Sequence, residues 1–157
     1  MTTVRVAEAG DVERCVGVLA QLPDYFTPNT HDEVRRDMPG QPAWVATDDD
    51  AVVGFVLVRR RYPTTAEITY AAVAPERRRS GIGTALVDAA VAALAADEVA
   101  IVEVKTLDAS AGYEPYVATR AFWERCGFRQ IDCIDPLPGW EPGNPAALYA
   151  AALTPTR

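Results

Sequence analysis

The chain has 157 residues, of which 49% are hydrophobic, and a net charge of -7. This length predicts one domain over residues 1–157, and the lack of a long apolar run or a secretion signal predicts a cytoplasmic protein without a membrane span. The acidic balance argues against nucleic acid as a partner, and the spacing of Cys15, Cys126 and Cys133 predicts buried thiols instead of disulfides or a metal site.

The first half of the chain is expected to place two helices between a first strand and a hairpin. Asp11 can cap the first helix, and an acidic turn at Asp48–Asp50 joins the two hairpin strands. The expected ranges are a strand at 4–9, a helix from 11 to about 22, a proline-broken loop over 21–33, a short helix near 31–38, and strands at 42–48 and 51–61.

The second half alternates strands with two helices. Apolar residues at every fourth position from Ile82 to Leu94 predict a buried helix face, and the later helix ends at Gly127. The expected ranges are a strand at 65–73, helices at 81–96 and about 116–126, and strands at 99–107, 128–134 and 146–153. This order predicts an α/β fold with a mixed sheet, antiparallel in its N-terminal half, a parallel crossover and about four helices.

Residues 77–84, RRRSGIGT, carry three arginines into a glycine loop between a predicted strand and a predicted helix. The first amides of a helix lack internal partners and glycines let an anion approach the backbone, so the loop predicts a phosphate or diphosphate site. The loop lacks the lysine of a Walker motif, and Leu86 stands in place of the third glycine of a dinucleotide motif. Together with Arg59–Arg61, it concentrates positive charge in an acidic chain. Solvated charge without a ligand is the alternative.

Two stretches resemble the GNAT N-acetyltransferases. VAPERRRSGIGTALVDAAV, from Val73, resembles the family's acetyl-CoA motif, in which V-x-P-x-x-[RQ]-x-x-G-x-G opens a helix, and ATRAFWERCGF (118–128) resembles its later A-x-x-x-Y-x-x-x-G-F helix. The resemblance covers nearly the whole chain and implies the GNAT fold, acetyl-CoA as co-substrate and no metal. It also implies that the backbone of Ala71 and Val73 pairs with the pantetheine arm. The residues that it implies around the pyrophosphate are Arg78, Arg79, Ser80, Gly81, Ile82, Gly83 and Thr84.

Glu67 lies in the apolar strand AEITY (66–70) and is the candidate general base. Burial of a carboxylate costs free energy unless it is paired, and a buried glutamate can take a proton from an ammonium directly or through water. The resemblance implies the same role, because some GNAT enzymes that acetylate protein lysines use the glutamate of a similar Ala-Glu-Ile. The alternative is an ion pair with an arginine of Arg59–Arg61. The only histidine, His31, falls in a polar loop and is expected to be solvated.

The family's usual acid is the tyrosine of its late motif, and Trp123 stands there instead. An indole N–H donates hydrogen bonds but is not a usable acid, so the usual assignment does not transfer. Tyr116, which lies two helical turns earlier, Tyr113 and water are the candidates for protonating the thiolate. Tyr116 and Trp123 are also expected to touch the cofactor. Helix packing is the alternative for both residues and for Phe122.

The acceptor is expected beside the loop QLPDYFTPNTHDE (21–33), because the resemblance implies that the segment after the first helix lines the acceptor side. Tyr25 and Phe26, together with the acids of this loop, suit a cationic amine. Trp140 and Glu141 are candidates for the opposite wall. The alternative is a solvated loop with Phe26 in the core.

These features predict an N-acetyltransferase that moves an acetyl group from acetyl-CoA to a primary amine, of a small molecule or a protein, in a ternary complex. Trp123 at the acid position favours one alternative, a non-catalytic acyl-CoA-binding sensor or regulatory module. A toxin that acetylates a charged tRNA is a further alternative, against which the acidic balance speaks. The expected partner is the amine substrate, and a homodimer is left open.

Overall fold

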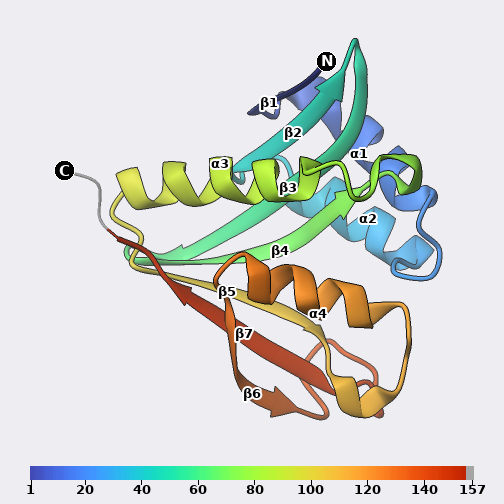
Figure 1. The fold of residues 1–157 in the computed structure, drawn as a ribbon, viewed down its shortest axis with the longest axis vertical. Coiled ribbons are helices and arrows are strands. Elements are labelled where there is room, and N and C mark those ends of the chain that lie inside the picture. Colours follow the sequence, from blue (N-terminus) through green and yellow to red (C-terminus); the bar gives the residue numbers. More distant parts are fainter. Residues whose placement is uncertain (155–157) are drawn as a thin grey trace.

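The computed structural model describes residues 1–154, which form one seven-stranded sheet with helices on both faces (Figure 1). The strand order across the sheet is β1-β2-β3-β4-β5-β7-β6. The strands are β1 (Thr2–Val6), β2 (Ala43–Asp48), β3 (Ala51–Tyr62), β4 (Thr65–Val73), β5 (Ile101–Leu107), β6 (Arg129–Ile134) and β7 (Ala146–Ala152). The helices are α1 (Val12–Ala20), α2 (Pro28–Asp37), α3 (Ile82–Ala96) and α4 (Tyr116–Arg125), with short 3-10 turns η1 (Ala9–Asp11), η2 (Pro75–Arg77) and η3 (Ala109–Ala111).

This arrangement confirms the predicted mixed α/β fold. Strands β1 to β4 pair antiparallel with their neighbours. β4 pairs in parallel with β5, and helix α3 forms the crossover connection between these two strands. Two predicted boundaries were wrong. The first strand covers Thr2–Val6 instead of 4–9, and α2 begins at Pro28 because a proline is well suited to the first helical position. None of the helices in residues 1–154 combines the length and hydrophobicity needed to cross a membrane.

Two expectations about single side chains were also wrong. His31 lies in α2 instead of a loop, and its Nε2 atom is buried without a hydrogen-bond partner among residues 1–154. Of the three cysteines only Cys15 is buried, whereas Cys126 is half-buried and Cys133 is exposed. Cys133 faces water because β6 is an edge strand whose residues are almost all exposed.

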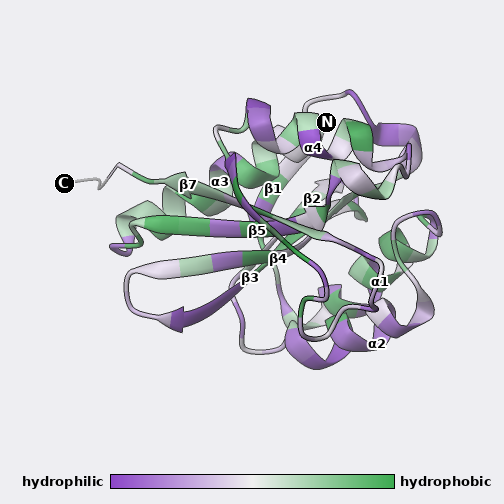
Figure 2. Cartoon of the chain, turned by 90° about the horizontal axis from the view of Figure 1, so that it is seen from below, coloured by the Kyte–Doolittle hydropathy of each residue, from purple (hydrophilic) through white to green (hydrophobic). Residues whose placement is uncertain are grey.

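The sheet separates two hydrophobic cores. On one face, α3 and α4 contribute residues such as Ile82, Leu86 and Trp123 to the first core. On the other face, α1 and α2 contribute Leu19 and Val34 to the second core. Figure 2 draws α2 largely in the hydrophilic colour, because its sequence PNTHDEVRRD is mostly polar. Val34 is the one residue of this helix that is fully buried. Both cores share strands β2, β3 and β4.

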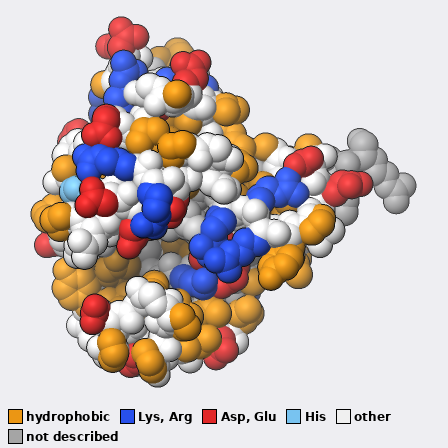
Figure 3. All heavy atoms as spheres, turned by 180° about the vertical axis from the view of Figure 1, so that it is seen from behind, with side chains coloured by type: hydrophobic (Ala, Val, Ile, Leu, Met, Phe, Trp, Pro, Cys, Tyr) orange, Lys and Arg blue, Asp and Glu red, His pale blue; other side chains and the backbone are white. Residues whose placement is uncertain are grey.

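Half of the sheet is covered on one face only. No residue of β5, β6 or β7 belongs to the second core, so α1 and α2 leave these strands uncovered. Figure 3 shows this side of the molecule, where lysine and arginine side chains gather beside a hollow. The uncovered half therefore gives the molecule an open face directly beside β4.

β4 and β5 are paired over only part of their length. The parallel ladder joins Thr65–Ile68 to Ile101–Val104 and stops there, although both strands continue. The register of β4 against β3 shifts at the same point. Thr69 is the extra residue of this β-bulge, and its hydroxyl donates a hydrogen bond to the Leu57 carbonyl oxygen at 3.3 Å. A bulge bends and twists its strand, so β4 leaves β5 here and the facing edges of both strands stay open beyond it.

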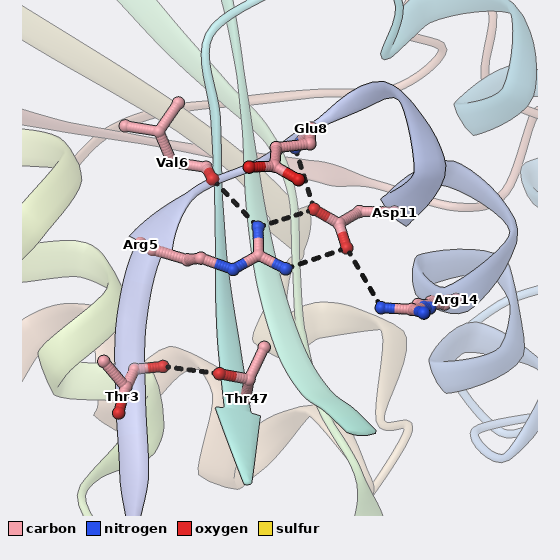
Figure 4. Close-up of polar contacts among 7 residues, drawn as sticks. All are labelled: Thr3, Arg5, Val6, Glu8, Asp11, Arg14 and Thr47. Carbon is pink, nitrogen blue, oxygen red and sulfur yellow. Dashed lines mark hydrogen bonds and ion pairs between the residues drawn. The ribbon is translucent and has the colours of Figure 1, made fainter. Parts of the chain in front are cut away.

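A partly buried ion pair ties β1 to the start of α1 (Figure 4). Asp11 is 2% exposed and accepts two hydrogen bonds from the Arg5 guanidinium, at 2.8 and 3.1 Å, and one from the Glu8 amide at 2.8 Å. These contacts, the Arg5 hydrogen bonds above all, hold the pKa of the Asp11 carboxyl below its usual range. The expected cap was wrong, because the carboxylate accepts from Arg5 and Glu8 instead of from an amide of α1.

Replacing Asp11 by Asn should lower the free energy of unfolding by about 1–2 kcal/mol near neutral pH, because Arg5, which is partly exposed, loses its charged partner. The folded-state pKa is lowered, so this contribution is present above the ordinary aspartate pKa and is lost as the pH falls through the folded value. The difference from the wild type should therefore shrink below about pH 4. Denaturant unfolding at several pH values measures it, with the exposed Asp50→Asn as control. A difference that does not depend on pH would contradict this account.

Candidate active site

The start of α3 offers free backbone amides. Gly81 precedes the helix in the left-handed conformation, with a φ of 82°, and has no side chain to cap it. The first hydrogen bond of the helix runs from the Ala85 amide to the Gly81 carbonyl oxygen at 3.0 Å. The amides of Ile82, Gly83 and Thr84 have no hydrogen-bond partner within residues 1–154. With the positive end of the helix dipole, these three N–H groups can bind an anion.

Gly81 and Gly83 are glycines for different physical reasons. A Cβ at Gly81 would meet open space, but the positive φ disfavours any residue other than glycine. A Cβ at Gly83 would lie 3.1 Å from Cε1 of Phe122, so a larger residue here would have to displace that ring from the contact between α3 and α4. The room for a ligand therefore lies beside Gly81.

Ion pairs neutralise part of the clustered arginines. The pairs are Arg59–Glu67, Arg60–Asp97 and Arg77–Asp48. Arg78 and Arg79 form no ion pair within residues 1–154, and both follow β4 directly before the free amides. The Arg78 guanidinium lies over the Tyr25 ring, 4.6 Å from its centroid, and donates a hydrogen bond to the tyrosine hydroxyl at 3.1 Å. Arg78 and Arg79 thus carry positive charge without a carboxylate partner among the described residues, next to the loop in sequence, and are candidates to bind an anion.

The separated strands leave a gap between β4 and β5, and a buried polar group lies on the adjoining part of β5. Ala71 and Val73, the expected backbone partners of the cofactor arm, lie on the part of β4 that has left β5. On β5, Val104 is the last residue that pairs with β4, and Thr106 lies two residues beyond it. Thr106 is still paired with β7 on the other side. Its side chain is 4% exposed, and its hydroxyl oxygen has no hydrogen-bond partner within residues 1–154. An extended chain that carries amides fits such a gap, because it can pair with an open strand edge.

Replacing Thr106 by the isosteric Val should raise the stability of the free protein by about 1 kcal/mol, because it removes a buried polar group without a partner. A thermal melt shows this as a higher midpoint. Thr106→Ser keeps the hydroxyl and loses a methyl group, so as the matched control it should be destabilising. A lower midpoint for the Val variant than for the wild type would mean that the hydroxyl has a bonding partner, such as a buried water.

Glu67 lies on the face of β4 that α3 and α4 do not cover, because its neighbours Ala66 and Ile68 belong to the first core. Its side chain is 15% exposed. Arg59 Nη2 lies 2.6 Å from Oε1, and Lys105 Nζ lies 3.3 Å from Oε2. The structure therefore contains the ion pair that was the alternative for this residue, together with a second cation. One carboxylate oxygen is held closely and the other more loosely.

Trp123 and Tyr116 occupy different environments on α4. Trp123 is 5% exposed and packs edge-on against Phe122 and Phe128, with ring centroids at 5.0 and 5.2 Å. This burial indicates a packing role, and its contact with a cofactor stays a prediction. The Tyr116 hydroxyl donates a hydrogen bond to the Tyr25 carbonyl oxygen at 3.2 Å, and burial raises its pKa to about 12. Its role as the acid also stays a prediction and requires this hydrogen bond to break.

Three tyrosine hydroxyls connect the α1–α2 loop to the start of α4. Tyr25 donates to the Pro115 carbonyl oxygen at 2.9 Å, and Tyr113 donates to that of Asp24 at 2.9 Å. Tyr116 donates back to Tyr25, and the rings of these two residues lie 5.2 Å apart. We call Tyr25, Tyr113 and Tyr116 the tyrosine bridge. It holds together two segments that are about 90 residues apart in the sequence.

The structure separates the residues predicted to contact the acceptor. Tyr25 contacts Arg78, which follows β4, and the start of α4, which follows β5, so it lies where the two separated strands end. Phe26 packs against the second core, as its alternative proposed. Trp140 is half-buried in the β6–β7 loop, and Glu141 is exposed.

The roles of three side chains on β4 and β5 were not predicted from the sequence. Lys105 and Glu103 lie on the uncovered face of β5, with 3.7 Å between them, and Glu103 is opposite Glu67 in the register. The Tyr70 hydroxyl donates a hydrogen bond to Glu33 Oε2 at 2.5 Å, which links β4 to α2, and burial is the main cause of its raised pKa. The alternation of VEVKT (102–106) indicates that Glu103 and Lys105 lie on one face of a strand. That they meet Glu67 on β4 depends on the register between the two strands, which the sequence does not give.

Comparison with known proteins identifies the family. The model of the acetyltransferase (GNAT) domain matches residues 39–130. No match is found among curated proteins. A GNAT-family acetyltransferase structure from Desulfovibrio desulfuricans is 24% identical with a TM-score of 0.82, covering 98% of this chain and 100% of that one. The ribosomal-protein-S18-alanine N-acetyltransferase from Escherichia coli is 16% identical with a TM-score of 0.80, covering 100% and 97%.

A third solved structure is a GNAT family acetyltransferase from Elizabethkingia anophelis with acetyl-CoA bound. It is 18% identical with a TM-score of 0.72, covering 97% of this chain and 98% of that one. At these identities the three structures show a shared fold. The family model covers more than half of the chain, including the gap between β4 and β5, the glycine loop and α4. The chain therefore belongs to the GNAT acetyltransferase family.

Proposed function

We propose that this chain is an N-acetyltransferase that moves an acetyl group from acetyl-CoA to a primary amine by direct attack in a ternary complex. The observation that carries the proposal is the open gap between β4 and β5 beside the free amides at the start of α3. Membership of the GNAT acetyltransferases and the relative with acetyl-CoA bound support it.

The residues present fit acetyl-CoA. Its diphosphate suits the free amides at the start of α3 and the guanidinium groups of Arg78 and Arg79. Its pantetheine arm suits the open edge of β4 at Ala71 and Val73, where it would add like a strand. When bound, acetyl-CoA would supply the acetyl group as a thioester.

Glu67 is the base in this proposal. An amine attacks only in its neutral form, so the ammonium must first lose a proton. Oε2 of Glu67 is better placed to accept it than Oε1, because Lys105 lies 3.3 Å from Oε2 whereas Arg59 holds Oε1 at 2.6 Å. A backbone amide on the open part of β4, beyond Ile68, stabilises the negative charge that develops on the reacting carbonyl oxygen. Tyr116 or water provides the proton for the departing thiolate.

Replacing Gly81 by Glu should weaken acetyl-CoA binding at least about tenfold, because it places a negative charge beside the free amides. Gly81→Gln is the matched control, since it has the same size and the same strain at positive φ but no charge. Gly83 is less suitable, because a side chain there would also press on Phe122 and disturb the contact between α3 and α4. Calorimetric titration measures the affinity, and a melting curve checks the fold. Equal affinities of the Glu and Gln variants would exclude a diphosphate at this loop.

Replacing Glu67 by Gln keeps the shape of the side chain and removes the base. Turnover should fall by roughly 10²–10⁴-fold near neutral pH, and the loss should shrink at high pH, where the amine is already neutral. Glu103→Gln is the matched control, because Glu103 pairs with the same Lys105. The measurement is a pH–rate profile by thiol release, beside a melting curve. An unchanged rate of the Glu67→Gln variant would mean that Glu67 only forms ion pairs. A larger loss of turnover in the Glu103→Gln variant would instead identify Glu103, on β5, as the base.

A non-catalytic acyl-CoA-binding sensor is the second candidate. The two cations around Glu67 favour it, because they engage the carboxylate that the enzyme would need. Both functions require acetyl-CoA binding, but only the enzyme releases free CoA thiol when an amine is added. A screen of amines with thiol detection therefore separates the two.

A further inference from the structure

Lys105 is the only lysine of the chain, because every other one of its fifteen lysine and arginine residues is an arginine. A position that needs only a positive charge can be filled by either residue. The two differ chemically, since a lysine amine becomes a nucleophile when it loses a proton, whereas a guanidinium group stays charged. The chain therefore carries its one side-chain primary amine on β5, directly after the last residue that pairs with β4.

Lys105 and Glu67 lie on either side of the point where the gap between β4 and β5 opens. Val104, the last residue of β5 that pairs with β4, precedes Lys105, and Ile68, the last residue of β4 in this ladder, follows Glu67. Lys105 Nζ lies 3.3 Å from Glu67 Oε2 and 3.7 Å from Glu103 Oε1. The lysine side chain is 25% exposed, on the face of the sheet that α1 and α2 leave uncovered. The amine is thus accessible and next to the candidate base.

The position of Lys105 also suits the thioester of bound acetyl-CoA. The glycine loop follows the C-terminal end of β4, so a pantetheine arm that runs back along this strand from the loop carries its thioester toward Ile68, where the gap begins. A lysine amine on its flexible stem can reach a group there. A general base acts from hydrogen-bond distance, which is often slightly longer in a protein without its ligands, and Glu67 Oε2 at 3.3 Å from Nζ fits this description.

We infer that Lys105 is an internal acceptor, which the protein acetylates at its own site. The inference rests on the proposed function, because it uses the same co-substrate and the same base. Glu67 takes one proton from the Lys105 ammonium, and the neutral Nζ attacks the thioester carbonyl carbon. A C–N bond forms and the C–S bond breaks. The nitrogen loses a second proton, and the CoA thiolate that leaves takes up one.

Acetylation changes the surroundings of Glu67. An acetylated lysine is neutral, so Lys105 loses its ion pairs with Glu67 and Glu103. Arg59, at Oε1, then remains as the cation that holds the Glu67 carboxylate. Self-acetylation therefore frees Oε2, the oxygen that an external amine requires in the proposed reaction.

Mass spectrometry tests this inference without an added amine. After incubation with acetyl-CoA, the protein should gain the mass of one acetyl group, and fragmentation should place it on Lys105. Lys105→Arg is the matched control, since it keeps the positive charge and should gain no acetyl group. Glu67→Gln should react at least about 100-fold more slowly near neutral pH, because it lacks the base. At saturating acetyl-CoA the rate should not depend on protein concentration, because the amine and the base belong to one molecule.

Three results would overturn the inference: no acetyl group on Lys105 in protein that binds acetyl-CoA by calorimetry, equal rates in the wild type and a folded Glu67→Gln protein, or a rate that rises with protein concentration. Thiol release with added primary amines such as butylamine separates it from the proposed function. If Lys105 is acetylated and no added amine is, self-acetylation stands and transfer to an external acceptor falls. If added amines are acetylated and Lys105 is not, the transferase stands and self-acetylation falls.

Discussion

One extra residue in β4 separates this strand from β5, and the candidate site depends on that separation. Without the bulge at Thr69, the parallel ladder could continue past Ile68 and satisfy the strand edge that an extended ligand needs. The same residue also changes the direction of the side chains that follow. Ala71 and Val73 pack toward the first core, which contains α3 and α4, while Tyr70 and Ala72 belong to the second. One shift of register therefore determines both the open edge and the groups on its two sides.

A cluster of arginines in the sequence does not by itself give a positively charged site, because ion pairs within the fold can neutralise it. Both arginine triplets look like strong positive patches, but their ion pairs connect elements of the fold. Arg59 links β3 to Glu67 on β4, and Arg60 links β3 to the end of α3. Arg77 fixes the glycine loop to the hairpin between β2 and β3. Only the two arginines after it are left beside the free amides.

Local features of the sequence were sufficient for much of the fold. The range of β4 and the start of α3 could be predicted within a residue, because alternation, helical spacing and a glycine turn are all contained in one segment. The free amides of the glycine loop were predictable for the same reason, and their binding of an anion stays a prediction. The residues around Glu67 were only partly predictable, since Lys105 reaches it through the pairing of β4 with β5. The contact of Tyr25 with Tyr116, 91 residues away, has no local signal at all.

The tyrosine bridge uses main-chain carbonyl oxygens as its acceptors, on the loop between α1 and α2 and at the start of α4. Every residue type has such a carbonyl, so neighbouring side chains can be exchanged without loss of these hydrogen bonds. The position of the two loops and the chemistry of their outward side chains are therefore set by different atoms. Such a division lets a sequence acquire a new acceptor preference by surface substitutions while the three tyrosines keep the frame in place.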